Sequence, residues 1–146
     1  MSRNREFEQI MQSAGLRPSP VRVMVLKVLS EAERPISSAD VERILETVDR
    51  SSVGRSLTAM AELGIVHTVD DGSGSMKYEL CHCHGEMDMH HHNDFHPHFR
   101  CRVCDTTFCF DEIEVPSIEL PTGFSGEAVN YVIKGVCPSC NSRGLG

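Results

Sequence analysis

The sequence predicts an α+β protein in two parts: a helical first part closed by a hairpin, and a second part made of short strands. Three observations lead to this expectation. Apolar residues recur at helical spacing through residues 4–63. The pattern then changes to two short apolar segments around the glycine-rich turn DDGSGS. Beyond residue 97, short strand-like segments alternate with prolines and glycines, and two Cys-x-x-Cys pairs enclose them.

Four helices are expected in the first part, separated by Pro18, Pro20 and Pro35. They cover residues 4–14, 20–33, 38–46 and 53–63, the last beginning after Asp49 or Ser51 and ending at Gly64. The residues expected to face inward are Phe7, Ile10, Met11, Val21, Met24, Val25, Val28, Leu29, Val41, Ile44, Leu45, Val53, Leu57, Met60 and Leu63.

Residues 65–69 and 76–80 are expected to form the two strands of a hairpin. Compact helices followed by a hairpin are the order of a winged helix, in which the helix before the hairpin enters the DNA major groove. The alternative is a generic helical domain with an added hairpin. In the second part, residues 98–104, 106–110 and 128–137 have strand character.

The charge is distributed unevenly along the chain. The net charge is -7, but residues 1–60 carry nine Lys and Arg against eight Asp and Glu, whereas residues 61–146 carry five against thirteen. The first part can therefore approach an anion. There is no apolar run long enough to span a membrane, and the N-terminus lacks an apolar signal core. We therefore expect no membrane association and a cytoplasmic protein, in which seven cysteines favour metal ligation over disulfides.

The strongest motif is the pair Cys101-x-x-Cys104 and Cys137-x-x-Cys140. Four thiolates suit a tetrahedral zinc ion, and such a closed site is structural. The 32 residues between the pairs exceed the length of a compact zinc ribbon, so the ion would staple a small sheet. The alternative is four unrelated buried thiols.

A second group of metal-ligand types lies between residues 81 and 98, which hold seven of the eight histidines. His96 and His98 alternate on a strand that leads to Cys101, so their rings share a face. His67, Glu79 and Cys81, on or just after the hairpin strands, could meet them there. Further candidate ligands in this stretch are His82, Cys83, His84, His90, His91 and His92. For His90–His92 the alternative is a solvated loop.

Together these segments resemble the Fur family of metal-responsive repressors over nearly the whole chain. The segments GLRPSPVRVMVLKVL, ISSADV, SSVGRSLTAMAELGIV and KYEL resemble the family's DNA-binding domain, and HPHFRCRVC and GVCPSC resemble its His-x-His-x-x-Cys-x-x-Cys and terminal Cys-x-x-Cys motifs. The resemblance implies a winged-helix DNA-binding domain over residues 1–80, a hinge over 81–95 and an α/β dimerisation domain over 96–146. It also implies a homodimer that binds palindromic double-stranded operators when a regulatory metal occupies the hinge.

The resemblance also implies roles for individual residues. The four cysteines match the structural zinc ligands, and His96 and His98 match the paired hinge histidines. Glu79 matches a carboxylate of iron-sensing members. His67 and Cys81 fall where zinc-sensing members place an Asp and a Cys, and Arg55 matches the arginine of the recognition helix. Ser51 and Ser52 fall near bases or phosphates, and we expect phosphate contacts from Arg17, Arg22 and Arg55.

Several positions depart from the family pattern. Gly54 stands where the recognition helix usually carries Tyr, which removes a DNA contact and weakens the helix. Pro35 replaces a histidine of iron sensors. Phe95, Pro97 and Val129 replace the ligands of an additional site. The segment between the hairpin and His96 is longer than is usual in the family.

A metal-gated repressor is the function that these features favour. An ion held by His67, Cys81, His96 and His98 would tie the hairpin to the second domain, and the mixture of Cys and His favours zinc over iron or manganese. The alternatives are a redox- or haem-responsive regulator and a zinc buffer or delivery protein that no longer reads DNA. An enzyme is not expected, because the sequence contains no HExxH motif, nucleophile elbow or phosphate loop.

Overall fold

The computed structural model describes residues 3–80, 97–110, 112–114, 116–127 and 129–144. The chain divides into two compact units, Met1–His92 and Asn93–Gly146, and each is described by itself. The predicted hinge, residues 81–95, lies outside the described residues. Among the residues that the structure describes, no helix combines the length and hydrophobicity needed to cross a bilayer.

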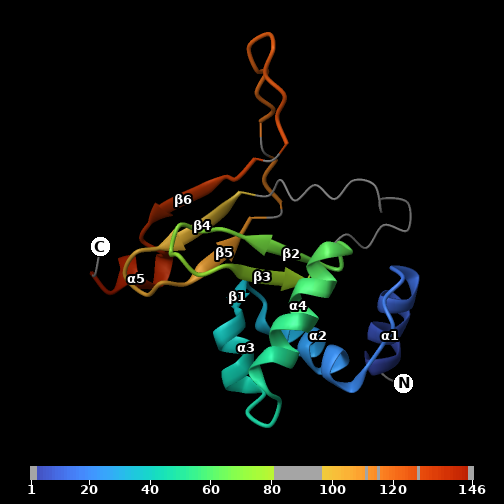
Figure 1. The fold of residues 1–146 in the computed structure, drawn as a ribbon. Coiled ribbons are helices and arrows are strands. Elements are labelled where there is room, and N and C mark those ends of the chain that lie inside the picture. Colours follow the sequence, from blue (N-terminus) through green and yellow to red (C-terminus); the bar gives the residue numbers. More distant parts are fainter. Residues whose placement is uncertain (1–2, 81–96, 111, 115, 128, 145–146) are drawn as a thin grey trace. The chain divides into compact units, whose positions relative to one another are not determined.

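The first unit has the architecture of a winged helix (Figure 1). Its elements are α1 Arg3–Ser13, α2 Pro20–Ala32, β1 Ile36–Ser37, α3 Ser38–Ile44, α4 Arg50–Glu62, β2 Val66–Val69 and β3 Lys77–Leu80. The strands form an antiparallel sheet in the order β1-β3-β2, in which β2 and β3 are the predicted hairpin. The α+β class, the four helices and the hairpin are thus confirmed, while the short strand β1 was not predicted.

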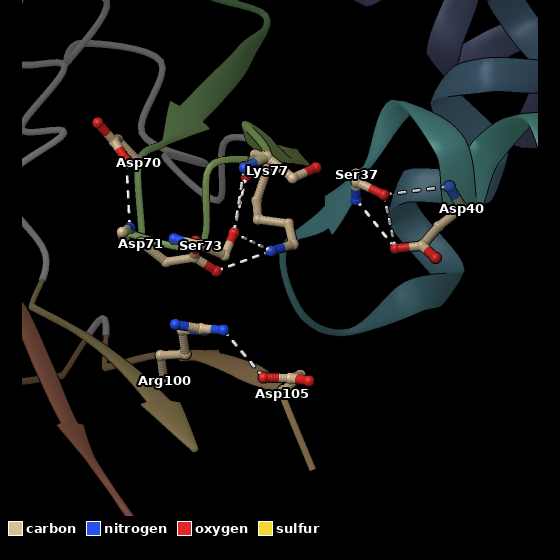
Figure 2. Close-up of polar contacts among 10 residues, drawn as sticks. Ser37, Asp40, Asp70, Asp71, Ser73, Lys77, Arg100 and Asp105 are labelled. Atoms are coloured by element: carbon tan, nitrogen blue, oxygen red, sulfur yellow. Dashed lines mark hydrogen bonds and ion pairs between the residues drawn. The ribbon is translucent and has the colours of Figure 1, made fainter. Parts of the chain in front are cut away.

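Local sequence explains where these helices begin. Ser19 caps α2 by accepting a hydrogen bond from the Arg22 N–H, and Pro20 occupies the first turn, where a missing N–H has no consequence. At α3 the caps are reciprocal: the Asp40 N–H donates to Ser37 Oγ and the Ser37 N–H donates to Asp40 Oδ2 (Figure 2). Asp49, one of the two predicted start points, caps α4.

The core of the first unit is built by apolar residues of α1–α4 and β2. Met11, Leu26, Val41, Leu57 and Met60 have no exposed surface. The prediction that Ile10, Ile44 and Leu63 face inward was wrong, because their exposed fractions are 40%, 60% and 44%. Ile44 and Leu63 lie at the C-terminal ends of α3 and α4, where the chain turns away before the side chain is covered.

The hairpin turn is braced by a buried ion pair. Lys77 Nζ lies 2.8 Å from Asp71 Oδ2 and 3.1 Å from Ser73 Oγ, and the Ser73 N–H donates to Asp71 Oδ1 (Figure 2). The Asp71 side chain is fully buried and that of Lys77 is 13% exposed. The cation of Lys77 is therefore used inside the turn instead of being presented to solvent.

The second unit is a small sheet followed by a short helix. Its elements are β4 His98–Cys101, β5 Thr107–Cys109, β6 Val132–Gly135 and α5 Pro138–Ser142. The strand order is β5-β4-β6, with β4 antiparallel to β5 and parallel to β6. The prediction of strand character from residue 128 was too early, because β6 begins at Val132. The helix α5 was not predicted.

Candidate metal centres and DNA-binding face

The four predicted zinc ligands come together in the second unit. Their sulfur atoms all lie within 4.8 Å of one another, and Cys104 Sγ lies 3.9 Å from Cys137 Sγ. Cys101 ends β4, Cys104 follows in the turn before β5, Cys137 occupies the position just before α5 and Cys140 lies inside α5. The turn after β4 therefore presents one Cys-x-x-Cys pair, and the start of α5 presents the other pair to the same point.

The backbone around Cys101 favours its thiolate. Burial opposes ionisation of this thiol, but the N–H groups of Cys104 and Cys137 point at its Sγ over 3.5 and 3.4 Å. Their combined effect lowers the pKa of Cys101 to about 6. A thiolate is the form that binds metal, so this sulfur is prepared for ligation.

The other sulfurs have distinct surroundings. The hydrogen bond between Cys104 Sγ and Thr106 Oγ1, at 3.2 Å, lowers the pKa of Cys104. Burial and the neighbouring Cys137 raise the pKa of Cys140 to about 11, against a donor from Arg143 Nη2 at 3.5 Å. The protein thus favours the thiolate of Cys101 and disfavours that of Cys140. A bound cation would be needed to keep all four cysteines deprotonated.

Distances and burial both fit zinc. A zinc–sulfur bond of about 2.3 Å in a tetrahedron places sulfur atoms about 3.8 Å apart, close to the separation of Cys104 and Cys137. Among the described residues of the second unit, the buried apolar core consists of Cys101, Cys137 and Cys140, with half-buried Phe99 and Phe108 packed against them. A core this small needs support from a metal, a disulfide or a second subunit to be stable, and four converging sulfur atoms suit a metal.

One predicted hinge histidine, His98, has an unpredicted partner. His98 is 6% exposed, and its register partner across the β4–β5 pair is Cys109, which is half-buried. Residues directly opposite on antiparallel strands place their Cβ atoms about 5 Å apart on one face. The second unit therefore offers an imidazole and a thiol side by side. Cys109 lies outside both Cys-x-x-Cys pairs, and only the strand register would have revealed it.

A matching pair lies on the hairpin of the first unit. His67 on β2 is the register partner of Glu79 on β3, and the two residues are 7% and 5% exposed. An imidazole and a carboxylate are again brought to one face by antiparallel pairing. The remaining predicted hinge ligands lie outside the described residues; they are Cys81, His82, Cys83, His84, His90, His91, His92 and His96.

The predicted DNA-contacting residues belong to the first unit. On α4, Ser51 and Arg55 are exposed and Ser52 is half-buried; near α2, Arg17 is exposed and Arg22 is half-buried. The hydroxyls of Ser51 and Ser52 both donate to the Asp49 carboxylate, which lowers the pKa of Asp49 to about 2. These two serines thus take part in capping α4, whatever else they contact.

The fold agrees with that of known proteins. The model of the ferric uptake regulator family matches residues 13–122. The chain belongs to this family. The prediction of a metal-responsive, DNA-binding regulator is confirmed at this level.

Two relatives and one structure show the range within the family. A zinc uptake regulation protein of Mycobacterium tuberculosis is 29% identical over 140 residues, which are 90% of this chain and all of that protein. A ferric uptake regulation protein of Synechococcus elongatus is 27% identical, over 89% of each chain. A solved zinc uptake regulator in complex with zinc and DNA is 20% identical and has a TM-score of 0.64 over the full length of both chains.

Proposed function

We propose that this family member is a zinc-responsive repressor that acts as a homodimer on operator DNA in the cytoplasm, and that it is not an enzyme. The observation that carries the proposal is the winged helix whose hairpin also holds a buried imidazole–carboxylate pair, His67 and Glu79. The β2–β3 hairpin follows α4, the proposed recognition helix (the reading helix), and is thereby also a candidate metal-binding element. Relatives named as zinc regulators, one of them solved with zinc and DNA, support zinc over other metals.

Two metal roles are proposed for different residues. Cys101, Cys104, Cys137 and Cys140 would hold a structural zinc ion that replaces the missing core of the second unit. A regulatory ion would be held by His67, Cys81, His96 and His98. Glu79 and Cys109 are further candidates for this ion because each is the register partner of one of these histidines.

The regulatory ion would act by linking the two domains, 1–80 and 96–146, across the hinge. An ion with ligands from both favours the arrangement in which all of them reach it, to the extent that its affinity differs between arrangements. In a dimer, that arrangement sets the spacing between two α4 helices, which must match successive major grooves. Metal binding would thus be converted into operator affinity.

Fluorescence anisotropy tests the proposal. The purified full-length protein, stripped of weakly bound metal, is titrated with promoter DNA of its own and of metal-uptake genes in zinc, iron or manganese. Zinc is expected to raise affinity most, and His98→Ala is expected to abolish the rise while the zinc at the four cysteines is retained. Stoichiometric zinc binding without DNA binding in any metal would instead favour a zinc buffer or delivery protein.

A further inference from the structure

The reading helix α4 exposes an arginine beside an empty position. Arg50 and Gly54 are four residues apart and therefore lie on the same face of α4. The Arg50 side chain is 88% exposed. A Cβ built on Gly54 would meet no atom within 4 Å, and this glycine does not have a positive φ. Neither packing nor backbone conformation in the first unit therefore requires glycine at this position.

The missing side chain matters for Arg50. A helical side chain points back towards the N-terminus and covers the turn that precedes its own Cα. A large side chain at position 54 would therefore lie over Arg50 and contact any ligand of α4 first. With Gly54 in its place, the Arg50 guanidinium has an open path to whatever α4 approaches.

Glu42 on α3 orients this guanidinium. Arg50 Nε lies 2.9 Å from Glu42 Oε1, while Ser38 Oγ donates to Glu42 Oε2, also at 2.9 Å. The Glu42 side chain is only 20% exposed, so the carboxylate is fixed by both helices. Because Glu42 engages Nε and the Arg50 side chain is 88% exposed, the two terminal nitrogens, Nη1 and Nη2, are left as a pair of donors for a ligand of α4.

Two parallel donors match one base edge in the major groove. Guanine presents O6 and N7 as adjacent acceptors, and bidentate arginine is the commonest contact to them. We propose that Arg50 is a base-reading arginine of α4, that its target is guanine, and that Glu42 is its positioning residue. This inference rests on the proposed DNA-binding function. It names a specificity determinant where the family's usual tyrosine is absent.

Arg43 provides a matched control. It lies on the neighbouring helix α3, its side chain is 73% exposed, and it pairs with Asp40 at 3.0 Å, as Arg50 pairs with Glu42. Arg43→Ala removes the same charge and the same kind of exposed ion pair. Because exposed pairs add little stability, neither arginine variant should unfold the protein. Far-ultraviolet circular dichroism checks this.

The test is selection from a randomised DNA library by the full-length zinc-loaded protein, followed by sequencing. The unchanged protein is expected to enrich a half-site with guanine at one fixed position. Arg50→Ala should reduce discrimination at that position by roughly 5- to 150-fold and leave the other positions intact. Glu42→Gln should weaken the same preference partially. Gly54→Tyr should remove it, and Arg43→Ala should change no position.

The outcomes separate the two proposals. If Arg50→Ala keeps the full guanine preference, or loses affinity equally for every sequence as a phosphate contact would, the assignment of Arg50 is wrong and the repressor proposal stands. If the unchanged protein enriches no sequence in any metal, both the repressor proposal and the role of Arg50 are overturned. A loss confined to one guanine position, together with an unchanged Arg43→Ala profile, supports the inference.

Discussion

Replacing Gly54 with alanine should stabilise the first unit. Gly54 lies inside the 13-residue helix α4 and has no positive φ, and an added Cβ would meet nothing within 4 Å. Alanine is favoured over glycine in a helix interior by about 1 kcal/mol, because glycine loses more backbone entropy on folding. No steric penalty opposes this gain. For a domain of this size, 1 kcal/mol corresponds to a rise in Tm of roughly 4–8 °C.

Thermal unfolding followed by far-ultraviolet circular dichroism measures the effect. In the described residues, α1–α4, of 7 to 13 residues each, all belong to the first unit, and only the five-residue α5 belongs to the second. The helical signal therefore reports the unit that contains the substitution. Zinc is kept saturating so that the second unit stays folded in both proteins.

Gly15→Ala is the matched control. A Cβ at Gly15 would also meet nothing within 4 Å, but Gly15 has φ +86°, where an L side chain is strained. Alanine there should destabilise by about 1–2 kcal/mol, because the left-handed conformation brings Cβ close to the following carbonyl oxygen. The same methyl group in open space should thus shift Tm in opposite directions. A Tm for Gly54→Ala that is unchanged or lowered would refute the claim that nothing in the folded protein requires glycine at position 54.

Three other perturbations test other parts of the molecule. Cys101→Ser should lose the zinc that survives chelator treatment and should expose the second unit to proteolysis, whereas Cys109→Ser should keep that zinc. Elemental analysis measures the zinc content of both variants, and retained zinc in Cys101→Ser would contradict the four-cysteine site. Asp49→Ala should lower the Tm of the first unit, because the cap of α4 is lost. The Asp49 pKa falls from 3.8 to about 2 on folding, so its contribution is complete above pH 3.8 and declines as the pH falls towards 2; a Tm difference that widens on acidification would oppose this account. Lys77→Met should destabilise the first unit by about 3–5 kcal/mol in urea titrations, because the buried Asp71 loses its cation, and a change near zero would show that this carboxylate is accommodated without it.

The helices were predictable because local signals agree with packing. Periodic apolar residues, the caps at Ser37 and Asp49, and Gly64 with φ 76° all act within a few residues of the helix ends that they define. The two-residue strand β1 has no periodicity to detect, and its pairing with β3 depends on residues some forty positions away. It could not be inferred without the assembled unit.

The candidate sites divide along the same line. The spacing of the cysteines was enough to predict that the two Cys-x-x-Cys pairs meet, because each pair is local in sequence and one shared metal explains both. Cys109 was missed because its link to His98 is a strand register, and Arg50 was missed because its orientation depends on Glu42 of another helix. A contact between residues of separate elements cannot be predicted from the local sequence pattern around either residue.

The two proposed metal sites must differ in kind if one is to sense metal. Among the described residues of the second unit, three of the four sulfur ligands, Cys101, Cys137 and Cys140, form the buried core, so losing that ion would unfold the unit instead of signalling. A sensor must exchange its ion while the fold persists. The buried pair His67 and Glu79 meets this condition, because the helical core of the first unit is complete without a metal. Occupancy of the cysteine site should therefore stay constant over the zinc concentrations that switch DNA binding, and a DNA-binding curve that tracks the loss of cysteine-bound zinc would show that folding, not sensing, controls this protein.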